Sequence, residues 1–214
     1  ILTMIDNTFA SPVNQKPIEL GCDIIMHSAT KYLGGHSDLM AGALIGNADF
    51  IERCRTLSAI YGMSLNAVDL SLLERSIKTL GVRVQQQNAN ALTIAEWLSK
   101  HPSIAKVHYP GLASHPGHDI AVKQMSGFGG MMSFELVGND IAFRDTFLKK
   151  LSMIAVATSL GGVESTMTIP MQTSHILLTE EERSALGIHE MLIRFSIGIE
   201  DRSEAHTSEL QSPC

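Results

Sequence analysis

Short apolar runs near the start of the chain predict its first strands. Residues 1–5 are mostly apolar, and residues 23–26 form a second short apolar run that leads into a polar stretch. The first run is a candidate strand, and the second is typical of a buried strand. A short helix is expected between them, through residues 16–20, with Gly21 as its stop. This order predicts a right-handed βαβ unit with parallel strands, so Asp6 and Lys31, which follow the two strand ends, should meet at one crevice.

The middle of the chain predicts one more strand, followed by helices. Residues 40–46 predict the strand and residues 49–57 a helix. Apolar residues recur at helical spacing over residues 70–80 and end near Gly81. A further helix carries apolar residues at positions 91, 94, 95 and 98 and stops before Pro102. We place a domain boundary near residue 80, with a smaller domain over residues 81–201.

The last third predicts a second set of strands and helices. Residues 132–136 alternate as a half-buried strand does, residues 141–151 predict a helix, and residues 153–157 another strand. Thr179 and Glu182 have the spacing of a capping box, for a helix closed by Gly187. Residues 108–118 contain three histidines in a turn-rich loop, but no carboxylate or cysteine stands at metal-ligand spacing, so no metal is predicted. The last strand, residues 191–197, carries Arg194 among apolar neighbours.

Composition narrows the classes of function. The chain has 214 residues, of which 44% are apolar and 18% charged, enough for a packed core. A net charge of -6 and a pI near 5.8 argue against nucleic-acid binding. No apolar run approaches the length of a membrane span, and the first residues do not resemble a secretory signal. Three widely separated cysteines (Cys22, Cys54 and Cys214) fit reduced thiols, so we expect a cytoplasmic protein.

Two positions are candidates for chemistry. The sequence MHSATKYLGGHSD, residues 26–38, places Ser28 and Thr30 just before Lys31. The lysine is either a surface residue of a polar turn or a nucleophile that forms a Schiff base with a carbonyl cofactor, whose phosphate the hydroxyls would hold. Arg194 is either paired with a carboxylate of the protein or available to one of a ligand. The residues alone leave both alternatives open.

Motifs along almost the whole chain resemble one family. They are DNTF at residues 6–9, GCDIIMHSATKY at 21–32, GHSD at 35–38, VHYPGL at 107–112, GFGGM at 127–131, SLGGVES at 159–165 and LIRFSIGIED at 192–201. In this order and spacing they resemble the cysteine and methionine metabolism family of pyridoxal-phosphate enzymes. This is the trans-sulfuration group, which includes cystathionine γ-synthase, cystathionine γ-lyase, cystathionine β-lyase and methionine γ-lyase.

The resemblance implies an α/β fold of the fold-type I, aspartate aminotransferase-like class, with residues 1–80 as the C-terminal part of the large cofactor-binding domain. It implies pyridoxal 5'-phosphate as cofactor and a small amino acid of the cystathionine or homoserine type as substrate, within a homotetramer. Lys31 would bind the cofactor and move protons on the substrate, and Asp6 would pair with the pyridine nitrogen. Ser28 and Thr30 would hold the phosphate. The substrate carboxylate would be bound by Arg194, with Ser159 beside it.

Some residues depart from the family pattern. Thr158 stands where γ-synthases and γ-lyases typically carry Glu, whereas residues 161–164, GGVE, resemble the γ-type enzymes. The sequence therefore predicts carbon–sulfur chemistry at the γ carbon, with β-lyase or methionine γ-lyase activity as alternatives and an aminotransferase as a weaker one. The family's glycine-rich turn, stacking tyrosine and partner-subunit tyrosine and arginine precede the equivalent of Ile1. A catalytically incomplete C-terminal fragment is thus a further alternative, and residues 202–214 resemble a non-native tail.

Overall fold

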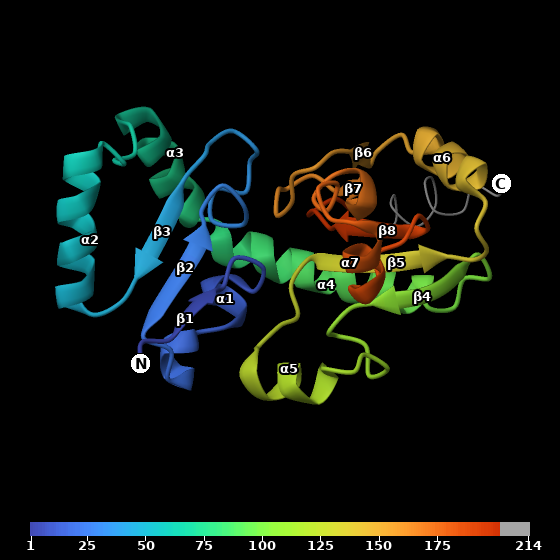
Figure 1. Ribbon diagram of the computed structural model, residues 1–214, viewed down its shortest axis with the longest axis horizontal. Helices are drawn as coiled ribbons and strands as arrows, with labels where there is room; N and C mark the ends of the chain where they lie inside the picture. The colour runs from blue at the N-terminus through green and yellow to red at the C-terminus, as the bar shows by residue number, and fades with distance from the viewer. Residues whose placement is uncertain (202–214) are drawn as a thin grey trace.

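The computed structural model describes residues 1–201, which form two sheets connected by a long helix (Figure 1). The first sheet has the order β1-β2-β3. Within it, β1 (Met4–Asp6) runs parallel to β2 (Ile24–Ser28), and β3 (Gly42–Ile45) runs antiparallel to β2. The predicted parallel pairing is confirmed, and its register sets Asp6 opposite Met26. The predicted tail lies outside the described residues.

Two short helical turns connect the parallel strands. They are α1 (Ser11–Asn14) and the 3-10 turn η1 (Pro17–Leu20), each with a proline in its first turn. Proline fits there because the first N–H groups of a helix have no partner within it. Gly21 ends η1 with a φ of 90°, a left-handed conformation that glycine adopts without steric cost. The predicted helix over residues 16–20 is thus a 3-10 turn, and α1 was not predicted.

Three helices follow the first sheet. They are α2 (Ala48–Tyr61), α3 (Ala67–Ile77) and α4 (Leu80–Leu98). The side chains of Asn47 and Asn66 cap the first two by accepting hydrogen bonds from backbone N–H groups of the first turn. No residue of α2 is buried, and in Figure 1 this helix lies at the far end of the molecule from the second sheet.

The second sheet contains five strands in the order β4-β5-β8-β7-β6. Its first four strands pair antiparallel, and β6 is parallel to β7. Their bounds are β4 (Ile104–His108), β5 (Met131–Leu136), β6 (Ala155–Val156), β7 (Thr166–Thr168) and β8 (Leu192–Ser196).

The remaining helical elements surround this sheet. They are α5 (His118–Gln124), α6 (Ile141–Lys150), η2 (Pro170–Gln172) and α7 (Glu180–Ala185). The capping box of Thr179 and Glu182 is confirmed at the start of α7. The expected turn-rich loop over residues 108–118 is shorter than predicted, because β4 extends to His108 and α5 begins at His118.

Helix α4 connects two hydrophobic cores. Leu80 and Val84, near its start, pack with Tyr32 and Leu33 in the core beside the first sheet. Residues 91, 94, 95 and 98, near its end, pack against the second sheet in a larger core that contains Phe134. The boundary near residue 80 remains a prediction, but the helix that begins there makes contacts with both cores.

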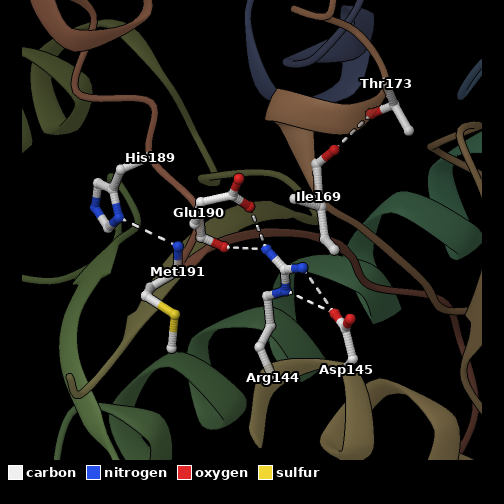
Figure 2. Close-up of polar contacts among 7 residues, drawn as sticks. All are labelled: Arg144, Asp145, Ile169, Thr173, His189, Glu190 and Met191. Carbon is white, nitrogen blue, oxygen red and sulfur yellow. Dashed lines mark hydrogen bonds and ion pairs between the residues drawn. The ribbon is translucent and has the colours of Figure 1, made fainter. Parts of the chain in front are cut away.

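A buried arginine fastens α6 to the second sheet (Figure 2). The Arg144 side chain is 1% exposed, and its guanidinium donates to the Asp145 carboxylate at 2.7 and 2.9 Å. It also donates to the Glu190 carboxylate at 2.6 Å and to the Glu190 carbonyl at 2.7 Å. Although burial opposes this, the hydrogen bonds to Asp145 and Glu190 raise the pKa of Arg144. Arg144 is therefore a fully paired structural cation.

Among the described residues, no helix is both long enough and apolar enough to cross a membrane.

Candidate active site

The ends of β1 and β2 are joined by a chain of hydrogen bonds. The Thr8 hydroxyl donates to Asp6 Oδ1 at 2.5 Å, and the Thr8 backbone N–H donates to the same oxygen at 3.0 Å. The Ser28 N–H then donates to Thr8 Oγ1 at 2.8 Å. Asp6 is exposed, whereas Thr8 is buried. Thr8 thus fixes the Asp6 carboxylate against the end of β2, and Asp6 Oδ2 has no hydrogen-bond partner among the described residues.

Lys31 lies in a tight turn directly after β2. Its N–H donates to the Ser28 carbonyl at 3.0 Å, and its carbonyl accepts from the Gly35 N–H at 2.7 Å. Gly35 has a φ of 71°, so the chain turns back there in a conformation that favours glycine. In the part of the chain that the structure describes, the Lys31 ammonium makes no hydrogen bond and no ion pair. The turn is held by its backbone, and the amine remains available.

The two hydroxyls before Lys31 differ in their contacts. Thr30 Oγ1 accepts from the Ala41 N–H at 3.0 Å and has a longer contact, 3.3 Å, to the Ala41 carbonyl. The Ser28 hydroxyl makes no hydrogen bond to any described residue. Ser28 can therefore donate to a ligand directly, and Thr30 can do so by releasing its longer contact.

A loop between β6 and β7, residues 159–164, contacts the Lys31 turn. A Cβ at Gly161 would stand 2.9 Å from the backbone N of Tyr32, so this loop touches the residue after Lys31. The Val163 N–H donates to the Gly35 carbonyl at 2.9 Å, and the Ser37 hydroxyl donates to the Glu164 carboxylate. Residues 159–164 and the Lys31 turn are thus joined by contacts of backbone and side chain.

Arg194 reaches this loop from the middle of β8. Its Nη2 donates to the Thr158 carbonyl at 2.6 Å and to the Ser159 carbonyl at 3.3 Å. Burial lowers the pKa of Arg194, and no carboxylate pairs with it among residues 1–201. The ion pair between Arg194 and a carboxylate of the protein, which the sequence left open, is therefore absent among these residues. Nε and Nη1 remain without a described partner, so the guanidinium can still bind a carboxylate of a ligand.

The structure therefore gathers the predicted residues into two connected groups. Asp6, Ser28, Thr30 and Lys31 lie at the ends of β1 and β2, and Ser159 and Arg194 lie at the loop that covers the Lys31 turn. The roles assigned to them remain predictions.

Two further residues shape the site, and sequence reasoning gave them no role. Thr8 connects Asp6 to Ser28, as described above. Gln87, which is fully buried in α4, donates from Nε2 to the Gly162 carbonyl at 2.7 Å and so fixes the covering loop. A polar residue at position 87 on the inner face of a helix was the available signal for Gln87, because such a group needs a partner.

His108, one of the three histidines expected in the loop, contacts Glu135, as does His189 from outside that loop. His108 Nε2 lies 2.6 Å from Glu135 Oε1, and His189 Nε2 lies 3.3 Å from Glu135 Oε2. Burial opposes the effect, but the hydrogen bond from His108 and the charges of both histidines lower the pKa of Glu135. Among the described residues, no cluster of three or more side chains has the arrangement of a metal site. Glu135 and its histidines are therefore a salt-bridge cluster of the second sheet.

Comparison with protein families identifies relatives along nearly the whole chain. The model of the family described as "Cys/Met metabolism PLP-dependent enzyme" matches residues 1–207. A cystathionine beta-lyase of Lactococcus lactis subsp. cremoris is 49% identical over 200 residues, which are 93% of this chain and 52% of that protein. The chloroplastic cystathionine gamma-synthase 1 of Arabidopsis thaliana is 45% identical over 211 residues, 99% of this chain and 37% of that protein.

Solved structures with a similar fold belong to the same kind of enzyme. A cystathionine gamma synthase of Xanthomonas oryzae pv. oryzae, solved in complex with aminoacrylate and cysteine, has a TM-score of 0.93 and 42% identity. The match covers 97% of this chain and 54% of that chain. The chain thus has the α/β fold of these enzymes and spans about half the length of most of the relatives it matches.

Proposed function

The chain belongs to the Cys/Met metabolism family of pyridoxal-phosphate-dependent enzymes, and from that premise we propose that it carries the lysine and the carboxylate-binding half of a trans-sulfuration active site. The reaction would break or form a carbon–sulfur bond at the γ carbon of an amino acid of the cystathionine or homoserine type. Two features of the described residues carry this proposal: the Lys31 amine has no partner among them, and the half-buried Arg194 of β8 has no carboxylate partner and binds the loop that touches the Lys31 turn.

The chemistry of the donor set fits pyridoxal 5'-phosphate. A phosphate needs hydrogen-bond donors, which the Ser28 and Thr30 hydroxyls supply. A protonated ring nitrogen needs an anion, which the free Oδ2 of Asp6 supplies. An aldehyde needs an amine with no competing ion pair, as at Lys31. When bound, the cofactor supplies an electron-withdrawing ring conjugated with the substrate nitrogen, which acidifies the bond between hydrogen and the α carbon.

The residues of the chain would divide the remaining tasks. Arg194 binds the substrate carboxylate through Nε and Nη1, which have no partner among residues 1–201, and the carbonyls of Thr158 and Ser159 hold the guanidinium in place. Lys31 Nζ, as the free amine, takes the α proton and returns it to a neighbouring carbon. Asp6, fixed by Thr8, holds a negative charge at the end of β1. The covering loop, residues 159–164, holds the Lys31 turn through the hydrogen bond from the Val163 N–H to the Gly35 carbonyl.

Chemical trapping at Lys31 tests the proposal. The full-length gene product would be purified, mixed with pyridoxal 5'-phosphate, scanned for a visible absorbance band, reduced with borohydride and digested. We expect a pyridoxyl-modified peptide that contains Lys31, and loss of both band and modified peptide in Lys31→Ala. Lys16→Ala, an exposed lysine paired with Glu19, is the matched control and should retain both. A band that persists in Lys31→Ala would overturn the assignment.

A second candidate function is β-elimination, because the relatives named cystathionine beta-lyase and those named gamma-synthase have similar identity to this chain, 49% and 45%. Product analysis with cystathionine separates the two reactions. Cleavage at the γ carbon releases cysteine and 2-oxobutyrate, and cleavage at the β carbon releases homocysteine and pyruvate. Predominant pyruvate would replace the γ assignment with the β assignment.

The surroundings of the protein are also part of the proposal. We propose a small amino acid as substrate, a cytoplasmic location and a homo-oligomer, with a tetramer expected from the family. Large apolar side chains at the end of α2, such as Leu57, Ile60 and Tyr61, are 49 to 71% exposed and would be covered in an assembly. Light scattering of the full-length gene product would measure its mass. Light scattering of the 214-residue chain, with an assay alongside, would show whether this piece alone assembles and reacts.

A further inference from the structure

A second arginine without a carboxylate lies under the Lys31 turn. Arg83, in the first turn of α4, donates from Nη1 to the Tyr32 carbonyl at 2.8 Å and from Nη2 to the Leu33 carbonyl at 3.3 Å. These are carbonyls of the turn that begins at Lys31. The same guanidinium donates to the Ser76 carbonyl at 2.9 Å, and its Nε to the Thr79 hydroxyl at 3.1 Å. Arg83 thus ties the Lys31 turn to the end of α3.

Arg83 differs from the other deeply buried arginine, Arg144. Both are almost fully buried, 4% and 1% exposed. Arg144 is paired with two carboxylates (Figure 2), whereas Arg83 donates only to carbonyls and a hydroxyl and has no carboxylate partner within residues 1–201. Burial without such compensation lowers the pKa of Arg83. A buried cation of this kind is costly, so stability alone gives weak reason for it.

The fit between Arg83 and the turn is close. A Cβ at Gly35 would overlap Arg83 Nη1, so the end of the turn leaves room for the guanidinium only because residue 35 is glycine. Figure 1 shows α4 starting beside the first sheet and its following turn. The guanidinium therefore occupies a space formed by the carbonyls after Lys31, and it orients them because its N–H groups have a fixed, planar geometry.

We propose that Arg83 is a positioning residue that fixes the direction in which the Lys31 side chain leaves its turn. The proposal rests on the proposed function of Lys31. Two carbonyls bound by one planar group cannot rotate independently, so Arg83 holds the backbone that directly follows Lys31. Without Arg83, the carbonyls of Tyr32 and Leu33 lose buried donors, the turn relaxes, and the amine no longer stands at a single position.

The test compares Arg83→Met, Arg83→Lys and Arg144→Met in the full-length gene product, with wild type and Lys31→Ala in the same series. We expect Arg83→Met to weaken binding of pyridoxal 5'-phosphate about tenfold, since it removes hydrogen bonds to a charged group. It should also shift the pH midpoint of the visible band. It should lower kcat by roughly 10- to 100-fold with little change in the substrate KM, because positioning acts on the reacting step. Arg83→Lys should lose less than Arg83→Met in each measurement, because an ammonium can bind one carbonyl but lacks the planar set of N–H groups that binds several.

Arg144→Met is the matched control, because it also removes a buried guanidinium but lies on α6, in the second core. It should lower the melting temperature while cofactor affinity and the pH midpoint stay at the wild-type values. If Arg83→Met and Arg144→Met change cofactor affinity and pH midpoint alike, or if neither changes them, Arg83 is purely structural and the proposal is wrong.

A milder variant decides the question if Arg83→Met does not fold. Thr79 is exposed, and Thr79→Val removes the acceptor of Arg83 Nε together with the hydroxyl that donates to the Ser76 carbonyl at 3.1 Å, while the Arg83 guanidinium keeps its carbonyl partners. We expect Thr79→Val to raise the dissociation constant of pyridoxal 5'-phosphate several-fold, in the same direction as Arg83→Lys, and wild-type binding in both would overturn the proposal. Failure of the proposed function is separate, since wild type itself would then show no band that depends on Lys31.

Discussion

Substitution of Arg194 by lysine should separate recognition of the substrate carboxylate from the chemistry at Lys31. The guanidinium uses Nη2 for the carbonyls of Thr158 and Ser159 and leaves Nε and Nη1 free among the described groups. A carboxylate can take two parallel N–H groups from a guanidinium, but a lysine ammonium offers a single point of charge. Arg194→Lys therefore keeps the charge and loses the paired geometry.

The size of the effect follows from the lost hydrogen bond. A hydrogen bond to a charged group contributes about 1.5–3 kcal/mol, and the site is half-buried, so water does not replace it easily. One such bond corresponds to a loss of roughly 10- to 150-fold in kcat/KM. Because the carboxylate is bound equally in the ground state and in the transition state, most of this loss should be a rise in KM.

The assay is steady-state cleavage of cystathionine by the full-length gene product, with the thiol product measured by a colorimetric reagent. The decarboxylated amine analogue of the substrate is the control, because it has no group for Arg194 to bind. Wild type and Arg194→Lys should cleave the analogue at similar, low rates. Arg75→Lys, at an exposed position in the last turn of α3, controls for the loss of any guanidinium.

An unchanged KM in Arg194→Lys would refute the reasoning, because the free N–H groups would then have no function in binding. An equal loss with the decarboxylated analogue would do so as well, since the effect would not depend on the carboxylate. In either case the unpaired guanidinium would be a structural feature that holds the loop at Thr158 and Ser159.

Three further predictions concern the loop, the second core and acid stability. Gly161→Ala should lower kcat at least tenfold, because its Cβ would press on the Tyr32 backbone. Gly62→Ala, with a similar positive φ but open space around it, should cost only about 1 kcal/mol of stability by thermal melting and no activity. Arg144→Met should lower the free energy of unfolding by ~2–3 kcal/mol in urea titrations, with its carboxylate partners rehydrated. The pKa of Glu135 in the folded protein lies below 4.5, so this residue binds fewer protons in the folded than in the unfolded chain. Its contribution to the free energy of unfolding is complete above pH 4.5 and is lost as the pH falls through the folded pKa. Glu135→Gln should therefore make the free energy of unfolding depend less steeply on pH in acid.

Local patterns allowed much of the first sheet and its crevice to be predicted from the sequence. Two apolar runs with a short connection specify parallel neighbours, and residues just beyond such strands must lie close together. Asp6 and Lys31 follow those runs directly, so their convergence required no long-range information. The capping box at Thr179 was readable for the same reason, because both of its hydrogen bonds lie within four residues.

Elements without an apolar pattern were missed. β7 consists of Thr166, Met167 and Thr168, all buried, and three residues are too few to show the alternation that predicts a strand. It is a strand because β8 and β6 pair with it on either side. α5 has the opposite difficulty: its apolar residues Ile120 and Val122 are more than half exposed, so its pattern does not mark a buried face. In both cases the neighbours decide the structure.

The arginines mark the limit of sequence reasoning for the site, because what distinguishes them is the partner. In the sequence, Arg83 and Arg194 each have an apolar residue on both sides, and Arg144 is followed directly by Asp145 but by no sign of Glu190. In the fold, two carboxylates lie against Arg144, whereas Arg83 and Arg194 contact only carbonyls and a hydroxyl among the described groups. Burying a cation without a counter-charge costs free energy, so a buried cation of this kind is a candidate for a role in ligand binding or in a reaction. Arg83 binds the backbone of the Lys31 turn, and Arg194 binds the loop that contacts this turn, so both of these arginines are connected with the proposed chemistry of the lysine.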